Sequence, residues 1–361
     1  MTGIRLPSDS FWKNRQVAIT GHMGFKGAWL CALLARLGAH TSGYGKDDRT
    51  SLLYPDLTLV NHDSHQGDIN ALPAVQGWLQ ATRPEFLLHL AAQPIVLSSY
   101  DDPMGTFRDN VMGTAAVLQA ARDIPSLKAI IVVTSDKVYR NADDGQAFHE
   151  SDHLGGKDPY SASKAAAEIV TSAMADSFYK DPASARVVTV RAGNVIGGGD
   201  WAAQRLLPDA ARAFASGQPL VVRSPHATRP WQHVLDPLAG YLLLCEALST
   251  DHPPQFREWN FGPDAGDSRL VSDVAERFTA SWGGSAEWRA ETVDPVKTEA
   301  RTLSVDSARA RAALCWLPRW AVDEAVRRTA AWYRDFAAGE APADLVTRDL
   351  DAFLAAPDVP G

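Results

Sequence analysis

The feature that most constrains the fold is a glycine repeat between a predicted strand and a predicted helix. Gly21, Gly24 and Gly27 are spaced three residues apart, after the apolar segment 16–20 and at the start of the amphipathic segment 26–37. In a strand–turn–helix unit, this spacing lets backbone N–H groups approach a pyrophosphate at the helix N-terminus. The repeat therefore predicts a dinucleotide-binding loop, which consists of Gly21, His22, Gly24, Phe25, Lys26 and Gly27.

The segments after this loop alternate between apolar strands and helices. Strands are predicted over 39–44, 85–91, 128–134 and 186–191, and helices over 71–82, 106–122 and 160–179. This alternation is typical of a parallel sheet covered by helices on both faces, with ligands at the carboxyl ends of the strands. We therefore predict an α/β fold with a doubly wound, Rossmann-type parallel sheet.

The regular alternation ends after residue 191. Strands are expected over 219–223 and 258–261, a polar loop over 226–232, and helices over 206–216, 234–248, 270–282, 322–336 and 343–354. Asp236 and Pro237 are expected to begin one of these helices, with Asp236 as the N-cap. We therefore expect residues 1–191 to form a dinucleotide-binding domain to which roughly 228–262 returns. Residues 192–361 then form a smaller, discontinuous, mixed α/β substrate-binding lobe.

Composition narrows the class of protein. The 361 residues are 45% hydrophobic, which is enough for a large core, and the net charge is −8. This charge argues against a nucleic-acid surface, which needs a basic patch. The three cysteines show no metal-binding spacing, and no metal is predicted. No apolar run is long enough to cross a membrane, and no signal-peptide core is visible, so a cytoplasmic location is expected.

Two polar motifs carry the chemistry. Tyr160 and Lys164 are four residues apart on a predicted helix and therefore share one face. A nearby ammonium stabilises a phenolate, so we expect Lys164 to lower the pKa of Tyr160 and make it a base for a hydroxyl group. Ser135, Asp136 and Lys137 directly follow the apolar strand 128–134. An alcohol dehydrogenase needs only a hydroxyl, a phenol and one lysine, so Asp136 and Lys137 indicate further proton transfers, such as elimination of water.

The rest of the expected cofactor site lies at the following strand ends. The residues placed near the adenine and its ribose are Asp68, Ile69, Ala91, Ala92 and Gln93. NAD sites often carry a carboxylate about twenty residues beyond the loop, after the second strand. No acid directly follows Tyr44 here, and Lys46 or Arg49 is suited to a 2′-phosphate. NAD is favoured, and NADP stays open.

These motifs resemble the extended short-chain dehydrogenase/reductase superfamily, and within it the nucleotide-sugar 4,6-dehydratases, most closely those acting on CDP-glucose. The resemblance spans about residues 11–332, and its most specific segments are 21–30, 134–139, 191–201, 229–241 and 259–263. Met23 departs from the pattern, because that branch usually has a small hydroxyl residue there. We expect the difference to weaken one contact near the cofactor phosphates.

The resemblance implies a reaction. Tyr160, activated by Lys164, takes the proton of the glucose 4-hydroxyl while C4 gives a hydride to tightly bound NAD, and Ser135 orients that hydroxyl. Lys137 then removes the C5 proton, with Tyr160 as the alternative base, and protonated Asp136 donates to the departing 6-hydroxyl. Return of the hydride to C6 gives a 4-keto-6-deoxy sugar and regenerates the cofactor within each turnover.

The substrate and partners are also implied. Asn194 is suited to a sugar or phosphate, and Arg205, Arg229 and Arg301 can bind a diphosphate, because guanidinium groups bind phosphate oxygens in a planar, bidentate way. The nucleotide sugar would be CDP-glucose, and the product would serve deoxysugar synthesis for cell-surface glycans such as O-antigen. A homodimer or dimer of dimers is expected through helices 106–122 and 160–179.

Three alternatives remain from the sequence: a nucleotide-sugar 4-epimerase or reductase, a 4,6-dehydratase for another NDP-hexose, and a non-catalytic NAD(P)-binding protein. Epimerases and reductases do not need Asp136 and Lys137, and a non-catalytic protein does not need Tyr160 and Lys164. The four residues together therefore favour a dehydratase.

Overall fold

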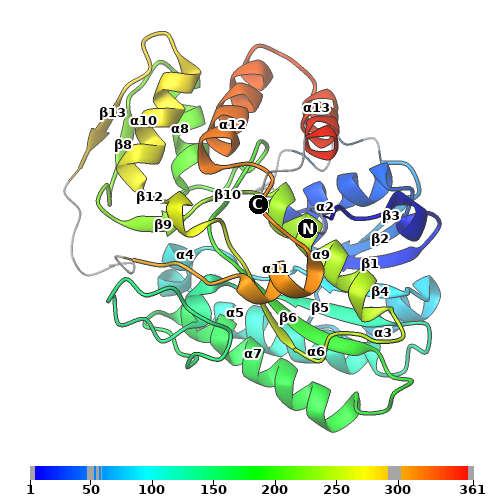
Figure 1. The fold of residues 1–361 in the computed structure, drawn as a ribbon. Coiled ribbons are helices and arrows are strands. Elements are labelled where there is room, and N and C mark those ends of the chain that lie inside the picture. The colour runs from blue at the N-terminus through cyan, green and yellow to red at the C-terminus, as the bar shows by residue number, and fades with distance from the viewer. Residues whose placement is uncertain (1–4, 47–52, 54–56, 58, 292–301, 357–361) are drawn as a thin grey trace.

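A computed structural model describes residues 5–46, 53, 57, 59–291 and 302–356. Its centre is a seven-stranded sheet in the order β11-β6-β5-β4-β1-β2-β3, in which all neighbouring strands are parallel (Figure 1). The strands are β1 (Gln16–Thr20), β2 (His40–Gly45), β3 (His62–Gln66), β4 (Phe86–His89), β5 (Ala129–Val133), β6 (Arg186–Ala192) and β11 (Glu258–Phe261). The predicted Rossmann-type fold is confirmed.

Helices cover both faces of this sheet. Alternate residues of a strand point to opposite faces, so Val17 and Ile19 of β1 join one core and Ala18 joins the other. The first core includes α2 (Phe25–Arg36) and α9 (Leu235–Leu248). The second includes α3 (Leu72–Thr82), α6 (Gly113–Ala121) and α7 (Pro159–Phe178), which lie below the sheet in Figure 1. Because both faces are covered, the central strands β4, β5 and β6 are largely apolar, and this composition made them recognisable in the sequence.

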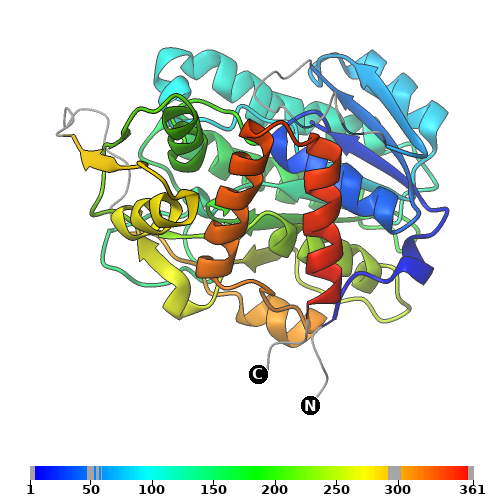
Figure 2. The ribbon, with the colours of Figure 1, turned by 90° about the horizontal axis from the view of Figure 1, so that it is seen from above.

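A smaller lobe lies beside the carboxyl ends of the strands. Its helices are α8 (Leu206–Ala215), α10 (Val271–Trp282), α12 (Val322–Ala337) and α13 (Pro342–Ala355). Its described residues also form three two-stranded ladders: β7 (Val195–Ile196) with β10 (Gln232–His233), β8 (Leu220–Val222) with β13 (Trp288–Ala290), and β9 (Thr228–Pro230) with β12 (Ser268–Leu270). Helices α12 and α13 run side by side, and α13 also contacts α2 (Figure 2). The lobe therefore packs on α2 of the main body.

The remaining elements are short connectors: α1 (Asp9–Trp12), α4 (Val96–Asp101), α5 (Pro103–Phe107), η2 (Arg108–Met112), η3 (Asp136–Val138), η4 (Ala265–Asp267) and α11 (Ala308–Leu314). The predicted helix 106–122 is interrupted, because η2 is a π-helical turn between α5 and α6. In the described part of the chain, no helix is long and apolar enough to cross a membrane.

Two local predictions were wrong, and one strand of the main sheet was missed. Strand β3 was not predicted, because its sequence is polar and four of its five residues are exposed at the sheet edge. The expected loop 226–232 contains β9 and is largely buried. Asp236 does not cap α9 from outside: the helix begins at Leu235, and the buried Asp236 carboxylate accepts a hydrogen bond from the Arg319 backbone N–H at 2.7 Å.

Candidate active site

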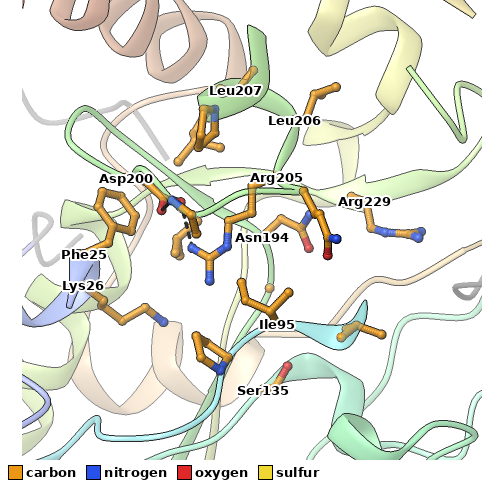
Figure 3. A pocket seen from close by; sticks show the side chains of 18 of the residues that line it. Phe25, Lys26, Ile95, Ser135, Asn194, Asp200, Arg205, Leu206, Leu207 and Arg229 are labelled. Carbon is orange, nitrogen blue, oxygen red and sulfur yellow. Dashed lines mark hydrogen bonds and ion pairs between the residues drawn. The ribbon is translucent and has the colours of Figure 1, made fainter. Parts of the chain in front are cut away.

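A cavity of about 720 Å³ lies at the carboxyl ends of β1, β4, β5 and β6, between the sheet and the smaller lobe (Figure 3). Its walls come from the loops after these strands, from the start of α7 and from α8. The predicted site residues that line it are Gly21, Gly24, Phe25, Lys26, Gly27, Ala91, Ala92, Ser135, Asp136, Lys137, Tyr160, Lys164, Asn194, Arg205 and Arg229. The fold therefore brings the glycine loop and both polar motifs to one cavity.

The glycine loop leaves room for a phosphate group. Gly21 has a φ of 72°, and a Cβ there would lie 2.7 Å from the Ala91 backbone nitrogen. A Cβ at Gly27 would lie 2.1 Å from the Gly21 carbonyl oxygen. Gly24 is the N-cap of α2, and no side chain caps the first N–H groups of that helix. Uncapped N–H groups at a helix N-terminus attract anions, so the loop fits the pyrophosphate of a dinucleotide.

The second structural unit of the site is a turn after β5, formed by residues 135–138. Ser135 is the N-cap of η3: its hydroxyl accepts a hydrogen bond from the Lys137 N–H at 3.2 Å and donates to Asp136 Oδ1 at 3.0 Å. Asp136 is only 2% exposed, and its Oδ2 has no hydrogen-bond partner among the described residues. Burial raises the pKa of Asp136, although Lys137, Arg229 and Lys26 each lower it. The carboxyl group is therefore held toward its protonated form.

Tyr160 and Lys164 project from the first two turns of α7, which is capped by Asp158. The pKa of Tyr160 is raised to about 12, mainly by burial, while its side-chain hydrogen bond with Ser135 opposes the rise. The expected lowering by Lys164 was wrong for this structure. The Lys164 ammonium donates to the Val133 carbonyl at 3.1 Å, and burial lowers its own pKa to about 7. For both groups, burial changes the pKa more than the neighbouring side chain one helical turn away does.

Cations gather around the same space. Burial and the neighbouring Arg205 lower the pKa of Lys26 to about 8, and Lys26 and Arg205 reach toward each other from opposite sides in Figure 3. Arg205 pairs with Asp200 at 2.7 Å. Among the described residues, six cationic and four acidic side chains line the cavity: Lys26, Lys137, Lys164, Arg205, Arg223 and Arg229, with Asp101, Asp136, Asp200 and Asp209. A positive cavity in a chain of net charge −8 is suited to phosphorylated ligands.

Comparison with known proteins identifies the family. The model of the NAD dependent epimerase/dehydratase family matches residues 17–262. CDP-glucose 4,6-dehydratase of Salmonella typhimurium is 37% identical over 354 residues, which cover 96% of this chain and 98% of that protein. The chain belongs to the NAD-dependent epimerase/dehydratase family. A dTDP-glucose 4,6-dehydratase of Streptomyces antibioticus is 28% identical over 292 residues, covering 78% of this chain and 77% of the relative.

Solved structures agree on the fold. A dTDP-glucose 4,6-dehydratase of Bacillus anthracis in complex with NAD has a TM-score of 0.75 at 18% identity, and covers 92% of this chain and 99% of that one. A UDP-glucose-4-epimerase of Stenotrophomonas maltophila with bound NAD has a TM-score of 0.79 at 20% identity, with 91% and 100% coverage. The family fold thus accommodates both epimerases and dehydratases, so the reaction must be argued from the site.

Four residues predicted for the cofactor site do not line the cavity: His22, Asp68, Ile69 and Gln93. The His22 ring lies against Gly43 and contacts the Ser64 hydroxyl at 2.8 Å. Asp68 forms an ion pair with Lys46 at 3.2 Å. The Ile69 side chain lies against Gly113. The Gln93 side chain donates to the Thr106 hydroxyl at 2.8 Å.

Four more residues differ from the predictions: two predicted ones are not described by the structure, and two that line the cavity were not predicted. Arg301 and Arg49 lie outside the described residues. Asp200 and Arg223 line the cavity without having been predicted as site residues. Asp200 was visible only as part of a glycine-rich stretch, and Arg223 follows a short strand with no motif around it. Within the described part of the chain, no cluster of His, Cys, Asp or Glu is arranged to hold a metal ion.

Proposed function

We propose that this chain is a CDP-glucose 4,6-dehydratase, a hydro-lyase that converts CDP-D-glucose to CDP-4-dehydro-6-deoxy-D-glucose. The observation that carries the proposal is that Asp136 and Lys137 line the same cavity as Tyr160 and Ser135. A 4-epimerase uses the hydroxyl and the phenol but has no step that needs the added acid and amine. The Salmonella relative, named CDP-glucose 4,6-dehydratase, supports the choice of nucleotide.

The glycine loop would hold NAD, with the α2 N-terminus facing its pyrophosphate. When bound, NAD supplies the hydride acceptor for C4 and the hydride donor for C6, so the cofactor is regenerated within each turnover. Lys46, the predicted contact for a 2′-phosphate, is bound between Asp68 at 3.2 Å and Asp109 at 3.6 Å. These two carboxylates offset its charge, which supports NAD over NADP.

The first chemical role belongs to Tyr160 and Ser135. The Tyr160 phenolate would accept the proton of the sugar 4-hydroxyl, and the Ser135 hydroxyl would orient that oxygen. With its pKa at about 12, the buried phenol needs a positive neighbour when it gives up its proton. Lys164 is one helical turn away and supplies that charge when protonated.

The second role belongs to Asp136 and Lys137. Oxidation at C4 acidifies the C5–H, and Lys137, or alternatively Tyr160, would take that proton. Asp136 would donate its proton to the departing 6-hydroxyl, which leaves as water. Its burial and raised pKa favour the protonated form, which a proton donor needs. The sugar and the diphosphate of the substrate would be bound by Asn194, Arg205, Arg229 and Arg301. Lys26 would lie between the cofactor pyrophosphate and the substrate diphosphate.

A substrate panel tests the proposal. Purified protein is incubated with NAD and with CDP-, dTDP-, UDP- or GDP-glucose, and the product is followed by the base-induced ultraviolet absorption of 4-keto-6-deoxy sugars. The expected result is a signal with CDP-glucose and none in Tyr160→Phe. Absence of the signal with every nucleotide-glucose would overturn the dehydratase proposal. Conversion to a galactose epimer would assign the chain to the epimerases instead.

We also propose a homodimer, or a dimer of dimers, formed through the helices below the sheet. Among the described residues, four of the six large exposed hydrophobic side chains lie on α5, η2 and α7: Met104, Met112, Ile169 and Phe178. Exposed apolar side chains gathered on adjacent helices are typical of an interaction surface. The proposed reaction fits a cytoplasmic enzyme that supplies deoxysugars for cell-surface glycans such as O-antigen.

A further inference from the structure

A buried ion pair lies behind the 135–138 turn. The carboxylate of Glu168, one helical turn after Lys164 on α7, meets the guanidinium of Arg191 on β6, and both side chains are 2% exposed. The pair is bidentate: Arg191 Nε donates to Oε1 at 2.9 Å and Nη2 donates to Oε2 at 2.7 Å. A buried pair of this kind is weak evidence for stability, because desolvation of the charges offsets their attraction. Its position therefore calls for a different explanation.

The pair contacts the residues at both ends of the turn. On one side, the Thr134 hydroxyl, directly before Ser135, donates to Glu168 Oε1. On the other side, Arg191 Nη1 donates to the Tyr139 hydroxyl at 2.9 Å, directly after Val138. Tyr139 in turn donates to Asn260 Oδ1 on β11 at 2.7 Å. The turn that carries Ser135, Asp136 and Lys137 is thus held by one ion pair at the two residues that flank it, Thr134 and Tyr139.

We propose that Glu168 and Arg191 are positioning residues that hold the 135–138 turn in register with Tyr160. This inference rests on the proposed function. Catalytic groups must be within a fraction of an ångström of their working position, and the turn itself is only three residues of 3-10 helix after a serine. The N-terminus of α7, which carries Tyr160, is fixed independently by its Asp158 cap and by a Ser99 contact to the Tyr160 N–H at 3.1 Å. Elimination uses Asp136 and Lys137 of the turn, whereas oxidation uses Ser135 together with the independently fixed Tyr160, so loosening the turn should slow elimination more than oxidation.

Replacing Glu168 or Arg191 would leave an unpaired buried charge and would test folding rather than positioning. The chain offers a milder, matched pair of changes. Thr134 and Thr189 are both buried, and each donates its hydroxyl to Glu168, to Oε1 and to Oε2 respectively. Only Thr134 is joined to the turn, whereas Thr189 lies inside β6. Thr134→Val and Thr189→Val each remove one hydroxyl from the same carboxylate at nearly constant volume.

For the Thr134→Val variant with CDP-glucose, we expect kcat to fall at least about tenfold, with KM within about twofold of wild type. Reduced cofactor should accumulate in the steady state, seen by its near-ultraviolet absorbance, because oxidation at C4 continues while elimination is slowed. For Thr189→Val we expect kcat within about twofold of wild type. Tyr139→Phe, which frees the other end of the turn, should behave like Thr134→Val.

Hydrogen exchange of the peptide covering 134–140 gives a second readout that needs no substrate. Faster exchange in Thr134→Val and Tyr139→Phe than in Thr189→Val supports the positioning role. Equal exchange in all three variants, or equal losses of kcat in the two threonine variants, overturns it. If wild-type protein makes no keto sugar, the proposed function fails, and the exchange comparison still decides the positioning role.

Discussion

Asp236 makes the stability of this protein depend on pH in a direction opposite to that of an ordinary paired aspartate. It is fully buried in the first turn of α9, and burial raises its pKa to about 8, although the Arg319 and Trp320 backbone N–H groups oppose the rise. In the unfolded chain an aspartate has a pKa near 3.9. Between these values the folded state binds a proton that the unfolded state does not. The contribution of Asp236 to the free energy of unfolding is therefore complete below about pH 4 and falls by about 1.4 kcal/mol per pH unit up to about pH 8.

Asp236→Asn removes this titration and leaves an acceptor for the Arg319 N–H. The free energy of unfolding of the variant, relative to wild type, should rise by about 2.5 kcal/mol between pH 5.5 and 7.5. Asp349→Asn is the matched control. Asp349 is also buried, but the nearby Arg328 offsets part of the effect of burial, and its pKa is raised only to about 6. Over the same interval its relative free energy should change by only about 0.8 kcal/mol.

Urea denaturation of both variants and wild type, at several pH values and without cofactor, measures these differences. Subtracting wild type cancels the buried histidines, which titrate in all three proteins. The result that refutes the reasoning is a relative free energy for Asp236→Asn that stays constant from pH 5.5 to 7.5. That result would mean that Asp236 is ionised in the folded protein despite its burial. Turnover of Asp236→Asn should match wild type, because the residue does not line the cavity.

Three further predictions concern the site and the assembly. Asp136→Asn should lower kcat by about 10²- to 10⁴-fold while reduced cofactor accumulates, since the amide cannot protonate the leaving hydroxyl; undiminished turnover would remove its acid role. Gly27→Ala should abolish NAD binding in calorimetry, because the new Cβ would lie 2.1 Å from the Gly21 carbonyl oxygen. Gly77→Ala, with no atom within 4 Å, should bind NAD normally and gain up to about 1 kcal/mol of stability. Ile169→Asp should shift the protein to monomer in sedimentation at unchanged fold, and an unchanged mass would place the interface elsewhere.

The sequence predicted the buried strands well and the exposed ones poorly. Six strands of the main sheet are mostly buried because helices cover the sheet on both faces, and all six were predicted from the sequence. Strand β3 was not predicted, because the sequence of an exposed edge strand resembles that of a polar loop. Residues His62–Gln66 show no alternation of apolar and polar side chains. The prediction of a polar loop over 226–232 was wrong for the opposite reason. Its polar residues Arg229 and Gln232 are buried, because β9 pairs with the distant strand β12 and the Gln232 side chain donates to the Phe261 carbonyl.

The candidate site was also predicted from the sequence only in part. Motif spacing was sufficient to place Ser135, Asp136, Tyr160 and Lys164, because their positions follow from a strand end and a helix face. The direction of the Tyr160 pKa was not predictable, since it depends on how completely the fold buries the phenol. The pairing of Glu168 with Arg191 was equally invisible, because it joins residues from α7 and β6 that share no motif.

The balance between burial and charge at Asp136 leads to a last prediction about pH and turnover. Three cations lower its pKa and burial raises it, with burial the larger effect. A bound diphosphate adds negative charge beside Lys26 and Arg229, so it weakens their pull and raises the pKa of Asp136 further. Activity needs the protonated acid and falls as pH rises through that pKa, so the alkaline limb of kcat should lie at higher pH than that of kcat/KM, which reports the free enzyme. If the two limbs coincide, or if the order is reversed, the group that limits activity at high pH is not a carboxyl facing the substrate phosphates.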